Sequence, residues 1–155
     1  MMKFAGEIIL IISSGITGFL CCENIRNKVK ICSELAKLCD FITADLSYRI
    51  TPAKQLLESG IKGEGFKHLG FVSTDNIERK QTVNSPLSKD ENGEISAFLY
   101  SLGKTDVSTQ KALISDFKEY ITNAMKAYDD KLKRNSKIYI SFGLFFGALF
   151  SLIWS

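Results

Sequence analysis

Thiol chemistry is the first activity to test against this sequence, because it holds four cysteines and a single histidine. His68 could serve as the base of a thiol dyad with Cys39. Cys39, however, falls on an apolar helical stripe, where the thiolate would be poorly stabilised. The sequence therefore predicts that the cysteines are small core residues of a reducing compartment and that His68 lies at the rim of the fold.

Metal and phosphate sites need ligand spacings that this sequence lacks. Cys21 and Cys22 are adjacent, and Cys32 and Cys39 are seven apart, so none forms the CxxC pair of a zinc site. Residues 60–67 (GIKGEGFK) lack the order of a phosphate loop and follow no predicted strand, which favours a flexible connection between helices. We predict no catalytic residue, no metal site, no cofactor and no enzymatic activity.

The two ends of the chain are apolar and predict two transmembrane helices. Residues 4–22 contain Glu7 as their one charged residue, and residues 138–154 contain none. A span needs about 20 apolar residues, with a lower limit near 17. The alternative for the first segment is a cleaved signal peptide. In a eukaryote, the second segment would then be a C-terminal tail that is exchanged for a lipid anchor. Glu7 interrupts the apolar run early and no A-x-A-like site follows it, which disfavours cleavage.

Glycines in these segments suggest close helix packing. Gly143 and Gly147 form a GxxxG pair, and Gly15 and Gly18 lie one turn apart. Such residues let transmembrane helices approach closely, within a chain or between copies in a homo-oligomer. Glycine is also frequent in transmembrane helices without such a role, so both interpretations stay open. Glu7 marks either a helix contact, an ion path or a group at headgroup level.

Basic residues flank both apolar segments on the side that faces the middle of the chain. They are Arg26, Lys28 and Lys30 after the first segment and Lys131, Lys133, Arg134 and Lys137 before the second. The positive-inside rule therefore predicts that the loop between the segments is cytoplasmic. The net charge of +3 reflects this topology, with some affinity for anionic headgroups. We predict no binding to nucleic acid, which usually requires a more basic patch.

Helical spacing dominates the middle of the chain. One apolar stripe continues directly from the first span and comprises Ile25, Cys32, Leu35, Cys39, Ile42 and Leu46. Thr51 and Pro52 should begin a short helix over residues 53–58, which the glycines at 60, 63 and 65 would end. Apolar residues over 66–72 suggest another short helix.

Two more helices are predicted before the second span. Ser88 and Glu91 have the capping-box spacing, and Gly103 should end that helix after Ile95, Phe98, Leu99 and Leu102. Thr105 or Asp106 should cap the last helix, whose stripe comprises Leu113, Phe117, Tyr120, Ala124, Ala127 and Leu132. We predict an all-α fold: an antiparallel multi-helix cytoplasmic bundle at 23–137, flanked by N- and C-terminal transmembrane helices at 4–22 and 138–154.

Two motifs carry a family resemblance. Residues 45–52 (DLSYRITP) resemble an acidic-x-x-Tyr-x-x-Thr-Pro signature, and residues 101–106 (SLGKTD) with Gln110 resemble an LGxxDxxxQ signature. In this order, between apolar ends, they resemble the stage III sporulation protein AB family of endospore-forming bacteria. Asp45 stands where Glu is usual in that family, Ala53 stands where Leu is usual, and the middle is shortened.

The resemblance implies a fold similar to the cytoplasmic bundle of type II secretion F proteins. It implies a location in the mother-cell membrane facing the forespore, where the protein would be a non-enzymatic platform subunit of a secretion-like channel. The expected partners are a stage III sporulation protein AA-like secretion ATPase and other membrane components of the channel complex. The alternative function is a two-span membrane regulator or adaptor whose helical bundle binds a soluble signalling partner.

The candidate residues divide into three groups. Candidate partner-binding residues are Asp45, Tyr48, Arg49, Asp106 and Gln110. Helix-capping or structural residues are Thr51, Pro52, Leu102 and Gly103, and transmembrane packing residues are Gly15, Gly18, Gly143 and Gly147. Asp45, Arg49 and Gln110 are the hardest to explain by capping, so they are the strongest contact candidates.

Overall fold

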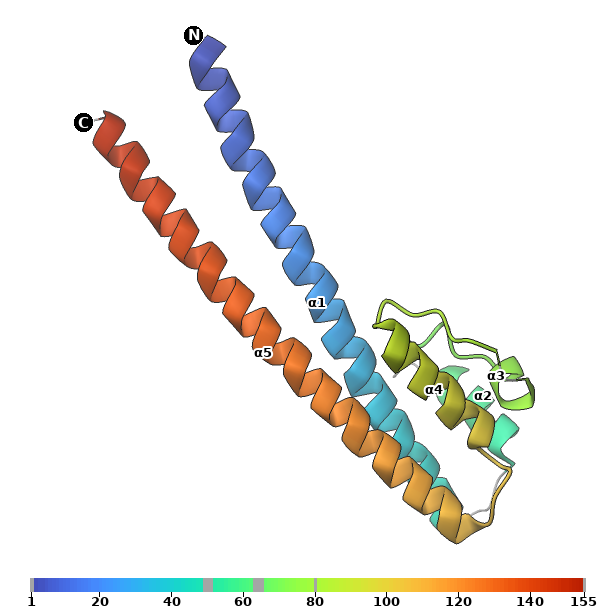
Figure 1. Ribbon diagram of the computed structural model, residues 1–155. Helices are drawn as coiled ribbons and strands as arrows, with labels where there is room; N and C mark the ends of the chain where they lie inside the picture. The colour runs from blue at the N-terminus through green and yellow to red at the C-terminus, as the bar shows by residue number, and fades with distance from the viewer. Residues whose placement is uncertain (1, 49–51, 63–65, 80, 155) are drawn as a thin grey trace. The chain divides into compact units, whose positions relative to one another are not determined.

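A computed structural model describes residues 2–48, 52–62, 66–79 and 81–154, with side chains except at 2–19, 21, 48, 53, 62, 139–140 and 142–154. Over these residues the protein is all-helical, as predicted (Figure 1). Its elements are α1 (Met2–Tyr48), α2 (Ala53–Lys62), α3 (Asp75–Glu78), α4 (Lys89–Ser101) and α5 (Val107–Trp154).

The chain divides into two compact units. Residues 27–126 form one, called here the bundle unit, and residues 1–26 with 127–155 form the terminal unit. Across the described residues, no helix has a stretch long and apolar enough to cross a membrane. Most side chains of the segments 4–22 and 138–154, including the four glycines Gly15, Gly18, Gly143 and Gly147, lie outside the described residues.

The apolar stripe predicted along the first helix is confirmed. All six of its residues are buried, from Ile25 to Leu46. Ile31 and Leu38 are buried as well, which widens the covered face beyond a single stripe. In the bundle unit α1 and α5 lie side by side and run in opposite directions (Figure 1). The wider face lets α1 contact the short helices in addition to α5.

Gly60 does not end α2, so that prediction is wrong. The helix continues through Gly60 to Lys62, and Gly63 and Gly65 lie outside the described residues. A Cβ built on Gly60 would lie 3.3 Å from Cε1 of Phe41 and 3.4 Å from Cδ1 of Leu38. Glycine is therefore present because α2 approaches α1 closely, and this contact offsets its low helix propensity.

Residues 66–72 form successive turns instead of the predicted helix. The N–H of Leu69 donates to the carbonyl of Phe66 at 3.4 Å, and that of Val72 donates to Leu69 at 2.9 Å. Of the apolar residues expected to enter the core here, Leu69 and Val72 are buried, whereas Phe66 and Phe71 are only half-buried. The N–H of His68 donates to the side chain of Glu34 on α1 at 2.8 Å, so these turns are fastened to α1.

An extended segment, residues 81–87, precedes α4 and is tied to it by polar side chains. The N–H of Val83 donates to Oγ of Ser96 at 2.8 Å, and the N–H of Ser85 donates to Oδ1 of Asn92 at 3.2 Å. Asn92 Nδ2 donates in turn to the carbonyls of Ser85 at 3.2 Å and Leu87 at 3.4 Å. These two α4 side chains replace the neighbouring strand that an extended backbone would otherwise need.

The predicted start and end of α4 are confirmed. Ser88 and Glu91 form a reciprocal capping box at its N-terminus. Leu102 is the buried C-cap residue, and Gly103 follows with a φ of 78°, the left-handed conformation that favours glycine. Phe98 on α4 stacks on Phe117 of α5 with ring centroids 4.0 Å apart. This stack fixes α4 against α5.

The predicted stripe of α5 is wrong by one position over part of its length. Ile114 and Ile121 are fully buried with Phe117, whereas Tyr120 and Ala127 are exposed and Leu113 is only half-buried. The buried series begins at Gln110 and continues with helical spacing. Because its first member is polar, the apolar pattern alone assigned the core face to the neighbouring residues.

Candidate interaction surface

His68 and Cys39 do not form a thiol dyad in the described part of the chain, in line with the prediction of core cysteines. Nδ1 of His68 lies 2.6 Å from Oε1 of Glu34, and no contact joins it to Cys39 among the described residues. Burial, assisted by the charge of Asp40, raises the pKa of Cys39 to about 12. Burial, assisted by Glu91, raises the pKa of Cys32 to about 12 as well. Both thiols therefore stay protonated at neutral pH and serve as core residues.

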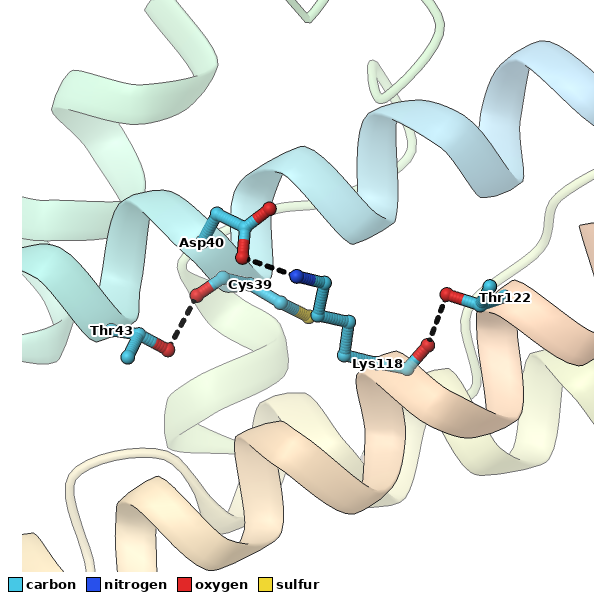
Figure 2. A network of polar contacts seen from close by, with 5 residues as sticks. All are labelled: Cys39, Asp40, Thr43, Lys118 and Thr122. Atoms are coloured by element: carbon cyan, nitrogen blue, oxygen red, sulfur yellow. Dashed lines mark hydrogen bonds and ion pairs between the residues drawn. The ribbon is translucent and has the colours of Figure 1, made fainter.

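An exposed ion pair marks the register of the two long helices in the bundle unit. Nζ of Lys118 on α5 lies 2.5 Å from Oδ1 of Asp40 on α1 (Figure 2). Thr43 and Thr122 donate their hydroxyls to carbonyls one turn earlier in their own helices, at 2.8 and 2.7 Å. Since the helices are antiparallel and rise equally per residue, counting outward from this pair brings Tyr48 level with Gln110. The end of α1 therefore lies beside the start of α5.

The first motif begins in the last turn of α1 and ends at Pro52, directly before α2. Asp45 is half-buried on α1 and has an interaction partner, and Tyr48 is the last residue of α1. The side chain of Tyr48, together with Arg49 and Thr51, lies outside the described residues. Pro52 is exposed, and its carbonyl accepts from the N–H of Leu56 at 3.1 Å. Pro52 thus precedes α2 by one residue and closes its first turn.

Asp106 in the second motif caps α5. Its carboxylate accepts from the N–H of Thr109 at 3.1 Å, from the Thr109 hydroxyl at 2.6 Å and from the Ser108 hydroxyl. The hydroxyl bonds, first that of Ser108 and then that of Thr109, hold the pKa of Asp106 well below its usual range. Of the two predicted capping residues, Thr105 and Asp106, it is Asp106 that caps the helix.

Gln110 has a structural role that the sequence did not suggest. It is buried, and its Nε2 donates to the carbonyl of Thr105 at 3.1 Å. This bond closes the connection between α4 and α5, whose other end is fixed by Leu102 and Gly103. Each named position of the LGxxDxxxQ signature therefore has a structural role in this connection. A contact between Gln110 and a partner remains a prediction.

The two motifs, separate in the sequence, meet at one end of the bundle unit. The register of α1 and α5 places residues 45–48 beside the start of α5, which follows directly on the second motif's loop (Figure 1). Sequence reasoning missed the exposed residues that accompany them. Val107 is 38% exposed at the start of α5, and Nζ of Lys104 lies 2.8 Å from the centroid of the Tyr100 ring. Their position beside the capping residues was the available signal.

The fold and its motifs define an all-helical protein built on two long antiparallel helices. Residues 73–154 match the family described as stage III sporulation protein AB. Because the match covers more than half of the chain, the protein belongs to this family, which confirms the resemblance. The matched range contains the second motif, while residues 45–52 lie before it. No curated protein and no solved structure gives a significant match to the chain.

Proposed function

We propose that this protein is a non-enzymatic platform subunit of a secretion-like channel between mother cell and forespore. Family membership gives it a role in sporulation. The further assignment rests on the arrangement of the chain, which has a helical middle part between apolar ends. The described residues of the two motifs make hydrogen bonds with nearby backbone groups, as Asp106, Gln110 and Pro52 do. Such a subunit needs anchors and a binding surface, and it needs no reactive group.

In this proposal the segments 4–22 and 138–154 span the mother-cell membrane, with residues 23–137 in the cytoplasm. The support is their apolar composition and the basic residues that border the intervening part. The helices α1 and α5 also continue through these segments without interruption. A single helix can therefore connect each anchor to the bundle unit.

The proposed partner is the stage III sporulation protein AA-like secretion ATPase, bound at the end of the bundle unit where the two motifs meet. The observation that carries this assignment is the position of residues 45–48 beside the start of α5, given by the register that the Asp40–Lys118 pair marks. Asp106 and Gln110 shape the loop, and Val107 is exposed at the start of α5 beside it. A surface that combines an exposed apolar residue with nearby charged groups is suited to binding another protein.

The binding assay uses the full chain in neutral detergent with the purified ATPase. Asp45→Lys combined with Arg49→Glu, and separately Val107→Arg, should each weaken binding at least tenfold, because charge or bulk at a docking surface opposes association. Asp129→Lys combined with Lys133→Asp is the control, since it exchanges the same two charges in the terminal unit. If both test variants bind the ATPase with wild-type affinity, the ATPase does not bind at this end of the bundle unit, and this part of the proposal is overturned.

Topology is tested with a cysteine placed at Gly70, where an added Cβ meets no atom within 4 Å. Gly70→Cys, in a chain with Cys21 and Cys22 changed to serine, should react with a membrane-impermeant maleimide only after the cells are permeabilised. Cys32 and Cys39 can stay because both are buried. Labelling of intact cells would overturn the cytoplasmic assignment.

A further inference from the structure

Three cations form a row on α5 in the terminal unit. Lys131, Arg134 and Lys137 are exposed and follow one another at intervals of three residues, so each lies about one helical turn beyond the last. Ile138, 46% exposed, falls on the same face, four residues after Arg134 and seven after Lys131. The row ends where the apolar segment 138–154 begins.

These three cations differ from their neighbours because no carboxylate of the described residues pairs with them. Nζ of Lys133 lies 2.6 Å from Oδ2 of Asp129, and Nη1 of Arg26 lies 3.6 Å from Oε2 of Glu23. Neither Lys131, Arg134 nor Lys137 has such a partner in the described part of the chain. The row therefore presents three charges that are available to an external anion.

The chemistry of the row suits phosphate groups arranged in a plane. Arginine binds phosphate through its planar fork, and lysine supplies a point charge on a long flexible stem that reaches a headgroup while the helix enters apolar surroundings. Nucleic acid carries the same phosphate chemistry. A membrane surface is favoured because the row runs directly into Ile138 and the uncharged segment behind it.

We propose that Lys131, Arg134 and Lys137 bind the headgroups of anionic lipids, so that the protein selects phosphatidylglycerol-like lipids over zwitterionic ones. The inference rests on the proposed membrane anchorage. It adds a ligand class to the terminal unit, whereas the ATPase is assigned to the bundle unit.

The experiment reconstitutes the full chain in phosphatidylcholine bilayers that carry a trace of spin-labelled phosphatidylglycerol or phosphatidylcholine. The immobilised fraction of each label gives their relative association constants at the protein surface. We expect phosphatidylglycerol to be preferred about fivefold, the effect of about one cation per headgroup. The preference should fall to near one in the Lys131→Gln, Arg134→Gln, Lys137→Gln triple variant and shrink in about 0.5 M salt.

A matched control removes three exposed lysines of the bundle unit through Lys37→Gln, Lys89→Gln and Lys111→Gln. This variant has the same net charge as the triple variant and should keep the wild-type preference. Equal association of both lipids with the wild-type chain, or an equal loss in the control, would overturn the inference.

Two further outcomes separate the sources of failure. A chain stripped from the vesicles by alkaline carbonate would overturn the anchorage together with this inference, whereas a retained chain without lipid preference overturns this inference alone. Binding of a fluorescent DNA duplex that disappears in the triple variant, without any lipid preference, would assign the row to nucleic acid instead.

Discussion

Glu34 on α1 holds His68, which lies in the turns after α2, through both of its carboxylate oxygens. The N–H of His68 donates to Oε2 at 2.8 Å, and Nδ1 lies 2.6 Å from Oε1. The Glu34 side chain is 12% exposed and that of His68 is 35% exposed. A carboxylate so nearly buried needs such partners, and the turn segment needs this acceptor. The pair therefore fastens the segment to the helix.

Glu34→Ala should lower the free energy of unfolding by about 2 kcal/mol, because it leaves the N–H of His68 without an acceptor. His68→Ala should cost only about 1 kcal/mol, since the backbone N–H still donates to Glu34. Urea unfolding of the full chain in neutral detergent, followed by circular dichroism, measures both. Glu34→Gln keeps an acceptor and should fall between them. Equal costs for the two alanine variants would contradict this account.

Asn92 is the residue on which the extended segment 81–87 depends most. Asn92→Ala removes its bonds to Ser85 and Leu87, leaving buried backbone groups unpaired, and should cost about 3 kcal/mol. Amide hydrogen exchange at Ser85 should accelerate more than exchange within α5. Glu94→Ala, an exposed change one half-turn later on α4, is the control. Unchanged exchange at Ser85 would show that other groups hold the segment.

Features encoded by neighbouring residues were predictable. The stripe of α1, the capping box of Ser88 and Glu91, and the end of α4 at Gly103 each depend on spacings within a few residues. The all-helical class follows from these, because no competing strand pattern interrupts them. The family resemblance also depended on short motifs, of which the second lies in the range that the family match covers.

Features that depend on distant residues were not predictable. Phe117 fits a stripe with Leu113 and Tyr120 as well as one with Ile114 and Ile121. The second stripe is the buried one, and its series begins at the polar residue Gln110, which the apolar pattern does not mark. The turns of residues 66–72 are held by Glu34 on another element, which accepts from the N–H of His68. Gly60 reads as a helix breaker until its contact with α1 is known. At Gly60 a tertiary contact overrides the local preference.

Gly93 and Gly103 should respond oppositely to alanine. Gly93 lies in α4, and an added Cβ meets nothing within 4 Å, so Gly93→Ala should stabilise the protein by about 0.5–1 kcal/mol through helix propensity. Gly103 has a φ of 78°, where a Cβ is strained, and Gly103→Ala should cost about 1–2 kcal/mol. The midpoints of urea unfolding compare them. Asparagine tolerates this conformation better than alanine, so Gly103→Asn should lose less stability than Gly103→Ala. Stability changes of the same sign for Gly93→Ala and Gly103→Ala would contradict the assigned conformations.

Asp106 should make the stability of the bundle unit dependent on pH in the acid range. Hydrogen bonds from Ser108 and Thr109 lower its pKa in the folded state below the ordinary value of 3.8. A carboxyl with a lowered folded pKa contributes stability that is present above its unfolded pKa and is lost as the pH falls toward the folded pKa. Asp106→Asn should therefore be less stable than the wild type at pH 7, and this gap should narrow below about pH 4.

The measurement is urea unfolding of wild-type and Asp106→Asn chains from pH 7 down to about pH 2.5. The gap should narrow only in part over this range, because the folded-state pKa of Asp106 is held well below its usual range. Asp116→Asn removes the same charge from an exposed residue of α5 beyond the first turn and should give a smaller gap at pH 7. Part of the Asp106 effect at neutral pH arises from its charge at the helix N-terminus, which salt screens. A gap that stays constant with pH would show that the cap depends on shape alone, with no contribution from the charge of Asp106.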